Sequence, residues 1–388
     1  MVFEIAGERM GDWASRHCKW LWSLACTGLV LVIVGLSVRA PVKDWWLARE
    51  ACGGALPGGD LKTVRTGVRL GSERESFDKE LGEYHCVLTN DADKVVVAVD
   101  AYPPGAARDE ELRFVAAYYP PHAVLPGGLP GFEDEHSRVF LMPECPNGVK
   151  GPLRKDHRVL VTTWTYFAES RGEKAAMLRL AVWMTNEVTA KLGCGGEPLT
   201  VPKDGAVPDT GRFVPRADAK GTACSALATT PVPAEGRDGE VRIAIADGGI
   251  VGRCTLHAAR DEDSYRFDGR GRPLVELTSW RGDWGTRVRE MGSGPDPLPM
   301  GDGAWKPALT EHRAWAVARC GGDTVGFAAH WGYDDRPREK READKRDQPP
   351  TEASQRAQRV LLREYVAAFA KDQVRRGHCT GLELPESP

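Results

Sequence analysis

The sequence predicts an α+β protein with an N-terminal transmembrane helix followed by two tandem, related domains. Each domain is expected to be an antiparallel sheet with a C-terminal helix and two disulfides. Three observations predict this fold: one uncharged apolar run near the N-terminus, two sets of four cysteines, and the same order of strand-like and helical segments in both halves. A chain of 388 residues has room for two or three domains of ordinary size.

The apolar run extends over residues 20–38 and contains nineteen residues without a charge, close to the number that a helix needs to cross a bilayer core. Two tryptophans stand at its start and two more lie beyond its end, as in the aromatic belts of membrane helices (Trp20, Trp22, Trp45, Trp46). The partner expected here is therefore the membrane bilayer, contacted through residues 20–38.

A cleaved signal peptide is the alternative interpretation, because Val38-Arg39-Ala40 has small residues at the spacing of a cleavage site. Two features favour an uncleaved signal-anchor. The run is longer than a usual signal core, and Pro41 would follow the cut, where signal peptidases generally fail.

Charges near the run do not orient it, because three basic residues precede it and three follow it (Arg9, Arg16, Lys19; Arg39, Lys43, Arg49). Cysteine usage decides instead. Eight of the ten cysteines lie after the run, which suits an oxidising compartment. We expect a single-pass protein of the cell membrane, with residues 1–19 as a cytoplasmic tail and the C-terminal region extracytoplasmic.

The eight later cysteines indicate a duplication. Their spacings are 34, 59 and 49 residues in the first half and 30, 66 and 59 in the second (Cys52, Cys86, Cys145, Cys194; Cys224, Cys254, Cys320, Cys379). The third cysteine of each set ends a similar segment, EHSRVFLMPEC from Glu135 and EHRAWAVARC from Glu311. This internal repeat gives domain 1 at residues 45–200, a linker at 201–220 and domain 2 at 221–388.

Strands and helices are expected in parallel order in the two halves. Alternating or β-branched segments predict four strands in each half, and each half closes with a helix that ends at its fourth cysteine (strands 84–89, 94–102, 138–144, 159–167 and helix 184–194; strands 241–246, 250–256, 314–319, 324–331 and helix 369–379). A turn after residue 89 and another after residue 246 join the first two strands of each half into hairpins, which we expect to be equivalent.

Neighbouring cysteines are expected to form disulfides within each half. The pairs would be Cys52 with Cys86, Cys145 with Cys194, Cys224 with Cys254, and Cys320 with Cys379. Four cysteines allow three connectivities in each half, so the other pairings stay open at the level of the sequence.

No established catalytic or cofactor motif occurs in the sequence. It contains no P-loop, no G-x-S-x-G elbow, no H-E-x-x-H, no dinucleotide fingerprint and no C-x-x-C. The formal charge of −3 disfavours a nucleic-acid partner, which normally requires a basic surplus. We therefore expect no catalytic residue, no cofactor and no metal.

Two pairs of residues are candidates for a ligand site. His136 and His312 follow a glutamate at matching positions of the two halves, where they could serve in acid/base chemistry or metal binding, or could simply cap a strand entry. Trp280 and Trp284 flank a short loop, where exposed aromatic rings often contact carbohydrate or protein; burial against the sheet is the alternative.

A short tail, one anchor and a cysteine-paired ectodomain, with 37 Arg against 15 Lys, resemble single-pass envelope proteins of high-GC actinobacteria. The resemblance is one of architecture and carries no activity. The duplicated, disulfide-linked domains without a catalytic motif, tethered by one helix, instead lead us to expect a non-enzymatic, membrane-tethered protein that binds an envelope protein or wall polymer. The alternatives are an envelope hydrolase or transferase with a dispersed active site, and a scaffold of a secretion or division complex.

Overall fold

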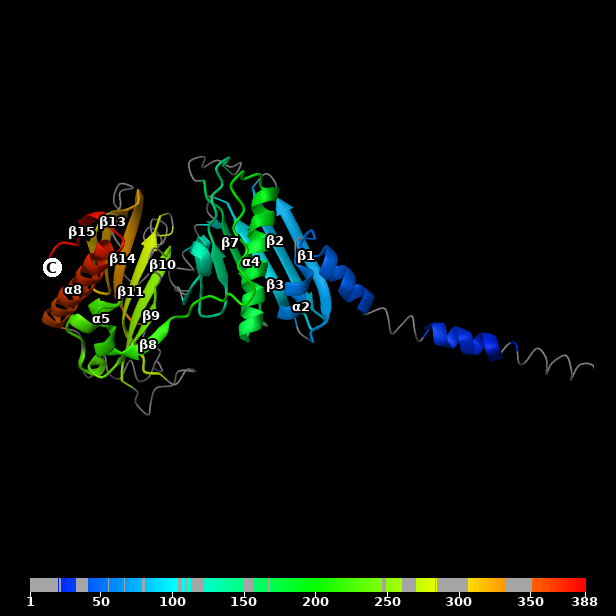
Figure 1. The fold of residues 1–388 in the computed structure, drawn as a ribbon, viewed down its shortest axis with the longest axis horizontal. Helices are drawn as coiled ribbons and strands as arrows, with labels where there is room; N and C mark the ends of the chain where they lie inside the picture. Colours follow the sequence, from blue (N-terminus) through cyan, green and yellow to red (C-terminus); the bar gives the residue numbers. More distant parts are fainter. Residues whose placement is uncertain are drawn as a thin grey trace, which may run out of the picture.

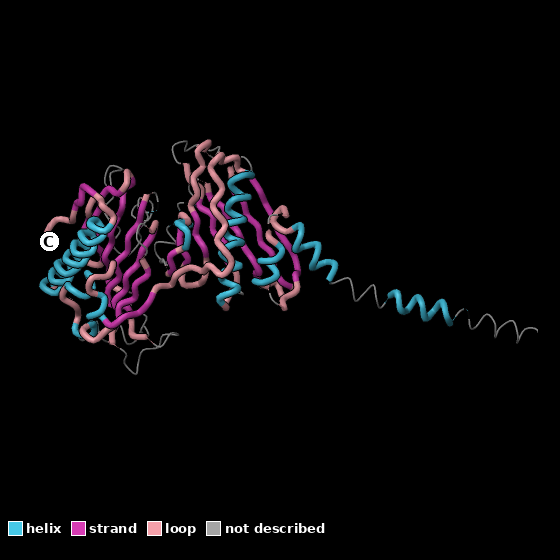
Figure 2. The backbone as a smooth tube through the Cα atoms, viewed as in Figure 1, coloured by secondary structure: helices cyan, strands magenta, loops and turns pink. Residues whose placement is uncertain are grey.

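The computed structural model describes most of the chain beyond residue 40 and a short segment before it. The described residues are 20, 22–32, 41–54, 56–65, 67–78, 81–103, 107, 108, 110–112, 122–148, 157–166, 168–245, 249–259, 270–282, 284, 306–332 and 351–388. Two domains lie side by side, each with a sheet and a long helix (Figures 1 and 2). The α+β class, the two antiparallel sheets and the C-terminal helix of each domain are confirmed.

The first domain is built on a seven-stranded antiparallel sheet in the order β1-β2-β3-β7-β6-β5-β4. Its elements are the helix α2 (Gly58–Val64), the strands β1 (Leu70–Asp78), β2 (Glu83–Asn90), β3 (Val95–Tyr102) and β4 (Ala123–Val124), the 3-10 helix η1 (Pro126–Gly128), the strands β5 (Gly131–Glu133), β6 (Val139–Leu141) and β7 (Leu160–Trp164), and the helix α4 (Arg171–Lys191). A helix at residues 41–50 precedes them and buries Leu47 in the same core.

Helix α4 begins where its sequence supplies a complete capping box. The Ser170 hydroxyl accepts from the Glu173 N–H, and the Glu173 carboxylate accepts from the Ser170 N–H. Apolar residues recur along α4 at helical spacing, and three of them, Ala181, Met184 and Val188, are fully buried. The helix therefore covers one face of the first sheet, as its 3.6-residue pattern predicts.

The second domain has the same plan. Its sheet runs β12-β13-β14-β11-β10-β9-β8, and β15 pairs with β13. Its elements are the strand β8 (Arg212–Pro215), the helices η2 (Arg216–Ala219), α5 (Ser225–Thr229) and η3 (Ala234–Gly236), the strands β9 (Glu240–Ala244), β10 (Val251–His257), β11 (Pro273–Arg281), β12 (Ala308–Leu309), β13 (Arg313–Cys320) and β14 (Asp323–Trp331), the helix α8 (Glu352–Arg376) and the strand β15 (Thr380–Glu383). Helix α8 lies on the outer side of this sheet, away from the first domain (Figure 1).

The two sheets share one strand order. β1-β2-β3-β7-β6 of the first domain corresponds to β9-β10-β11-β14-β13 of the second, with Cys86 on β2 and Cys254 on β10. One sequence expectation is wrong in detail. The hairpin of β2 and β3 is not equivalent to the hairpin of β9 and β10, because β10 corresponds to β2. The strand of the second domain that corresponds to β3 is β11, which the sequence pattern did not reveal.

All four predicted disulfides are present. Cys52 pairs with Cys86, Cys145 with Cys194, Cys224 with Cys254, and Cys320 with Cys379. In each domain, one bridge joins the segment before the sheet's core to β2 or β10, and the other joins the end of the long helix to Cys145, shortly after β6, or to Cys320, the last residue of β13.

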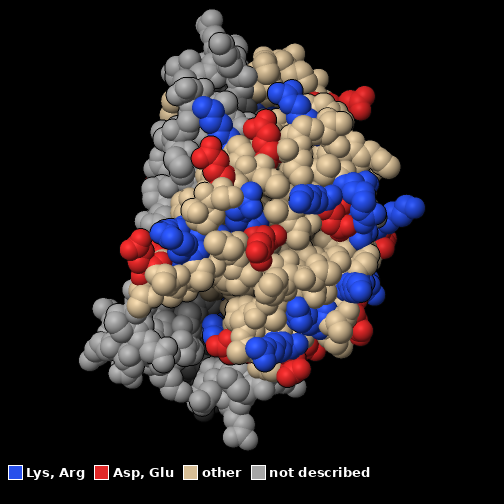
Figure 3. Space-filling model, turned by 90° about the vertical axis from the view of Figure 1, so that its left-hand side faces the viewer, with Lys and Arg blue, Asp and Glu red and all other residues tan. Residues whose placement is uncertain are grey.

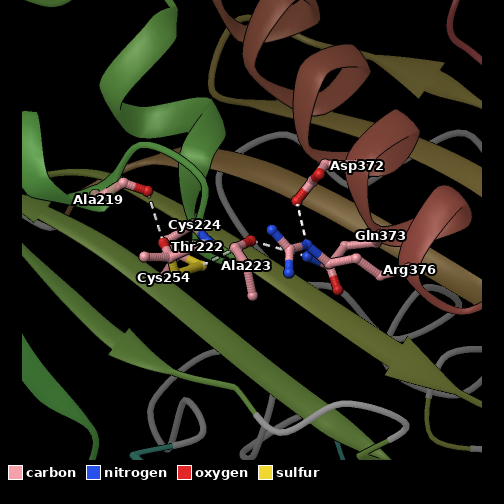
Figure 4. The surroundings of a disulfide bond; sticks show 8 residues. All are labelled: Ala219, Thr222, Ala223, Cys224, Cys254, Asp372, Gln373 and Arg376. Atoms are coloured by element: carbon pink, nitrogen blue, oxygen red, sulfur yellow. Dashed lines mark hydrogen bonds and ion pairs between the residues drawn. A yellow bond between two sulfur atoms is a disulfide. The ribbon is translucent and has the colours of Figure 1, made fainter.

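The long helix of the second domain also contacts the neighbourhood of a bridge through side chains (Figure 4). Gln373 of α8 donates to the carbonyl of Ala223, next to Cys224, at 2.8 Å. Arg376, one turn further along the helix, donates to Asp372 at 2.7 Å. The Cys224–Cys254 bridge and the C-terminal half of α8 thus form one continuous packed unit.

The face of each sheet that is not covered by its long helix is called here its open face. Apolar residues of both open faces meet in one buried cluster that joins the domains (Leu112, Phe132, Phe140, Met142 and Leu160 of the first; Val251, Trp280, Trp284, Ala308, Trp315, Val317 and Ala328 of the second). Phe132 contacts Trp280 and Trp284 at ring-centroid distances of 6.0 and 5.2 Å. The open faces are thereby partly occupied by one another.

Within the described residues, no helix is long and apolar enough to cross a membrane. Of the predicted anchor at 20–38, Trp20 and residues 22–32 are helical, whereas residues 21 and 33–38 lie outside the described part, as does the predicted tail at 1–19. The transmembrane helix expected from the sequence is therefore not supported by the described structure.

Candidate functional site

A row of polar side chains crosses the open face of the second sheet beside the apolar cluster. Strand register places Arg313 of β13 opposite His330 of β14, His330 opposite Glu276 of β11, and Glu276 opposite Thr255 of β10. Arg253, two residues before Thr255, lies on the same face because side chains alternate along a strand. These five residues are called the polar row.

The carboxylate at the centre of the polar row is buried and ionised. The Glu276 side chain is 6% exposed and pairs with the Arg253 guanidinium. Burial alone would raise the pKa of Glu276, but the charge of Arg253, with further contributions from His330 and His257, holds this pKa below its ordinary value. Arg253 and Glu276 thus neutralise each other.

His330 is a neutral imidazole at the edge of this ion pair. Its Nδ1 lies 3.1 Å from the carbonyl oxygen of Trp331, which requires a proton on Nδ1, and its Nε2 lies 3.9 Å from Glu276 Oε2. Burial lowers the pKa of His330, and this effect exceeds the opposing attraction of Glu276. The unprotonated Nε2 is therefore an acceptor within the polar row.

The positive charge of Arg313 is not compensated within the polar row, because the one carboxylate of the row is paired with Arg253. Its guanidinium makes no hydrogen bond and no ion pair with any residue that the structure describes, and burial lowers its pKa. An arginine stays protonated under these conditions. Thr255 is 2% exposed, and its hydroxyl oxygen Oγ1 lacks a hydrogen-bond partner among the described residues.

The first domain shows that the fold does not require this chemistry. When β2 and β10 are aligned on Cys86 and Cys254, the first domain has Val87, Ala98 and Trp164 at the positions of Thr255, Glu276 and His330. A sheet with two apolar residues and a tryptophan at these positions folds in the same topology. A buried ion pair costs free energy in desolvation, so the Arg253–Glu276 pair, which has no counterpart at these positions of the first domain, points to a function.

A second polar group lies on the open face of the first sheet. Register places Ser76, His85 and Asp100 in one line across β1, β2 and β3, and His85 Nδ1 is 2.5 Å from Asp100 Oδ1. All three residues line a hollow of about 540 Å³, together with Phe77 and Tyr102. No hydrogen bond joins Ser76 to His85 among the described contacts, so this is a His–Asp pair with a serine nearby.

The repeated Glu-His motif forms exposed turns. His136 lies in the turn between β5 and β6, where the Asp134 carboxylate accepts from the N–H groups of His136 and Arg138 at 2.8 Å each. His312 lies in the turn between β12 and β13, where Thr310 Oγ1 accepts from the N–H groups of His312 and Arg313. The two histidines are on separate hairpins and do not form one site, although His312 directly precedes Arg313.

The tryptophan pair is in the interdomain cluster. Trp280 and Trp284 are 4% and 2% exposed, and Trp284 Nε1 donates to the carbonyl of Pro130 at 3.2 Å. Their rings pack on Phe132 of the other domain. They therefore hold the two domains together and are not available to an external ligand.

Metal-binding geometry is absent from the polar row. In the part of the chain that the structure describes, one group of potential ligands lies close together, Cys52, Glu73 and Cys86. Both sulfurs belong to a disulfide, and the Glu73 carboxylate accepts from the Cys52 N–H at 2.6 Å. This group is a structural contact of the disulfide.

The outer surface over α8 mixes acidic and basic side chains without a field of one sign (Figure 3). Comparison with known proteins gives no further guide, because no family model, no curated protein and no solved structure matches the chain.

Proposed function

We propose that the chain is a membrane-tethered, extracytoplasmic protein of the cell envelope that binds an envelope protein or wall polymer without an enzymatic role. The observation that carries the proposal is the polar row. It holds a charged and an accepting group on a rigid sheet, and no described contact joins a nucleophile to a base within it. Such a set of groups suits recognition better than covalent chemistry.

The extracytoplasmic location is supported by the four disulfides, which persist in oxidising compartments. The tether is supported by residues 20–38 of the sequence. The helix at residues 22–32 stands apart from both domains, and its apolar side chains, Leu29 and Leu31 among them, are more than half exposed (Figure 1). Exposed apolar residues of this kind need a lipid or protein environment.

In-cell photo-crosslinking tests the proposal. A photoreactive residue replaces the exposed His312, beside Arg313, in the full chain; a matched chain carries it at the exposed Asp91, in the turn between β2 and β3. We expect a discrete adduct from position 312 that is absent from position 91. Recovery of nothing above background from position 312 would contradict a binding role for this face.

Hydrolysis is a second candidate function, favoured by the line of Ser76, His85 and Asp100. The Asp100 carboxylate orients the His85 ring through Nδ1, which leaves Nε2 available to take a proton from a serine hydroxyl. At the corresponding positions the second domain has Ala244, Arg253 and Thr278, so the fold does not demand the line.

A fluorophosphonate probe of serine nucleophiles tests this candidate. If the line is active, the wild-type chain is labelled and Ser76→Ala is not, while Ser72→Ala on the same strand stays labelled. Ser72 is a suitable control because its hydroxyl is already engaged by Thr89 Oγ1 at 2.9 Å. Equal labelling of the wild type and Ser76→Ala, or none of either, removes the candidate.

A further inference from the structure

We propose that the polar row of the second domain binds an oxyanion, a carboxylate or a phosphate group, with the Arg313 guanidinium as its principal contact. The inference rests on the proposed binding function and names the chemistry of the ligand. It starts from the charges of the row. Arg253 is committed to Glu276, His330 is flanked by Glu276 and the Trp331 carbonyl, and Arg313 has no acidic partner among the described residues.

The equivalent arginine of the first domain shows what a purely structural arginine does at this position. Extending the register of β6 and β7 by one residue places Arg138, which directly precedes β6, opposite Trp164, just as Arg313, the first residue of β13, lies opposite His330. Arg138 lies 3.8 Å from the Glu111 carboxylate and 5.7 Å from the centre of the Trp164 ring. Its charge is compensated by an acid and an aromatic face, and neither is supplied to Arg313 by the described residues.

The central carboxylate of the row, Glu276, restricts where an anion can bind. The Glu276 carboxylate would repel an anion placed near Arg253 or Thr255, so the favourable position is on the Arg313 side of His330. There a guanidinium can give two parallel N–H donors to a carboxylate or phosphate. The unprotonated Nε2 of His330 can accept from a hydroxyl, an amine or a water carried next to that anion.

Thr255 supplies an independent sign that the row is completed by something outside the described residues. Its hydroxyl is buried, and Oγ1 has no hydrogen-bond partner within the described chain. The corresponding residue of the first domain, Val87, has the same shape without the hydroxyl. A buried hydroxyl without a partner costs free energy. Thr255 lies beyond Glu276 as seen from Arg313, so an uncharged donor or acceptor of the same ligand, and not the oxyanion, would satisfy this hydroxyl.

Two sources of the oxyanion fit an envelope protein, the free carboxylate of a wall peptide and the phosphate of an anionic wall polymer. Two probes distinguish them: an N-acetylated dipeptide with a free C-terminal carboxylate, and glycerol 3-phosphate. Uncharged glycerol is the negative control. Binding is measured by isothermal titration calorimetry on the full chain in neutral detergent at low ionic strength, because salt screens such a contact.

We expect one of the two anions to bind the wild type and glycerol not to bind. Arg313→Gln should weaken that binding about tenfold or more, since a charged hydrogen-bonded contact is lost. Arg138→Gln is the matched control in the first domain and should leave the affinity unchanged. Arg313→Gln should also unfold at the wild-type temperature, because its guanidinium holds no partner in the described structure.

The inference is overturned if neither anion binds the wild type, or if Arg313→Gln and the wild type bind equally well. These results leave the proposed function separately testable. If the chain with the photoreactive residue at position 312 forms its crosslink but neither anion binds, the envelope partner is retained and the oxyanion is rejected. If that chain forms no crosslink, the proposed binding function itself is rejected.

Discussion

The Glu276 carboxylate loses nearly all of its hydration inside the second domain. The free-energy cost of burying this charge is offset mainly by its ion pair with Arg253. Arg253 is 12% exposed and Glu276 6% exposed as side chains, so solvent screens this pair far less than a surface pair. Removing one partner leaves the other charged and buried. Replacing both charged residues by uncharged ones leaves no unpaired buried charge. The first domain has His85 and Ala98 at these two positions, so the fold does not need the ion pair.

Glu276→Gln is expected to lower the free energy of unfolding by about 3 to 5 kcal/mol, because it leaves the Arg253 guanidinium buried without its counter-ion. The double variant Arg253→Met with Glu276→Leu should recover most of this loss. Chemical denaturation of the single and double variants measures both values. The exposed pair Arg158 and Glu144 is the control, where Glu144→Gln should cost less than about 1 kcal/mol. A double variant as unstable as the sum of its single variants would contradict this account.

At the scale of secondary-structure elements, the end of α8 is held by chemistry that the sequence already indicates. Cys379 follows α8 closely, and its disulfide to Cys320 attaches the helix end to the last residue of β13. β15 begins at the next residue and pairs with β13. The bridge therefore fixes both the helix terminus and the strand that returns after it.

The paired variant Cys320→Ala with Cys379→Ala is expected to destabilise the protein by roughly 4 kcal/mol in the chain-entropy model, because the closed loop spans 59 residues. Local opening should appear first at β15 and in the last turn of α8. Amide hydrogen exchange followed by mass spectrometry measures it. Unchanged protection of residues 370–383 would show that packing alone holds this end. Protection of α4 in the first domain serves as the internal reference.

Sequence patterns predicted the elements that carry a local signal. The cysteine order indicated the four bridges, and the segment 184–194 correctly predicted the C-terminal part of α4. The first three turns of this helix and its capping box at Ser170 and Glu173 were not predicted. β1 gave no such signal, because this edge strand is exposed along most of its length and does not alternate. β11 gave none either, because it is buried on both faces and its polar residues, Glu276 and Thr278, stand among apolar ones.

The polar row was missed for a different physical reason. Its members come from four strands, β10, β11, β13 and β14, and only the register between these strands brings them together. A polar residue every second position in Val251–His257 was the available signal for β10. The Glu-His motif at 311 and 312 led to the correct hairpin, but the chemically important residue is the arginine that follows it.

At the scale of the whole molecule, the two copies contact each other through the same face. Phe140 and Trp315 occupy equivalent register positions, as do Tyr102 and Trp280, and all four belong to the joint cluster or pack against it. Equivalent faces of the two copies therefore form the boundary between the domains. Arg242 of β9 adds polar contacts across the boundary, donating to the carbonyl of His122.

The domains should consequently stay together without a covalent link. A protease site placed at residues 203–206, an exposed turn in the linker, allows the chain to be cut after folding. We expect the two halves to elute as one species in size-exclusion chromatography, because the buried aromatic cluster and the His122 contact remain intact. The same cut in Trp284→Ala should weaken the association by about 3 to 5 kcal/mol, since it removes a ring buried to 2% and its hydrogen bond to Pro130.

Trp46→Ala is the matched control for that cut, because Trp46 is 55% exposed and lies outside the cluster. Its halves should remain associated like those of the wild type. If the cut halves of Trp284→Ala stay together as tightly as those of Trp46→Ala, the cluster does not hold the domains. If the wild-type halves separate at once, the linker and not the shared face sets the arrangement, and the polar row would then belong to one domain acting alone.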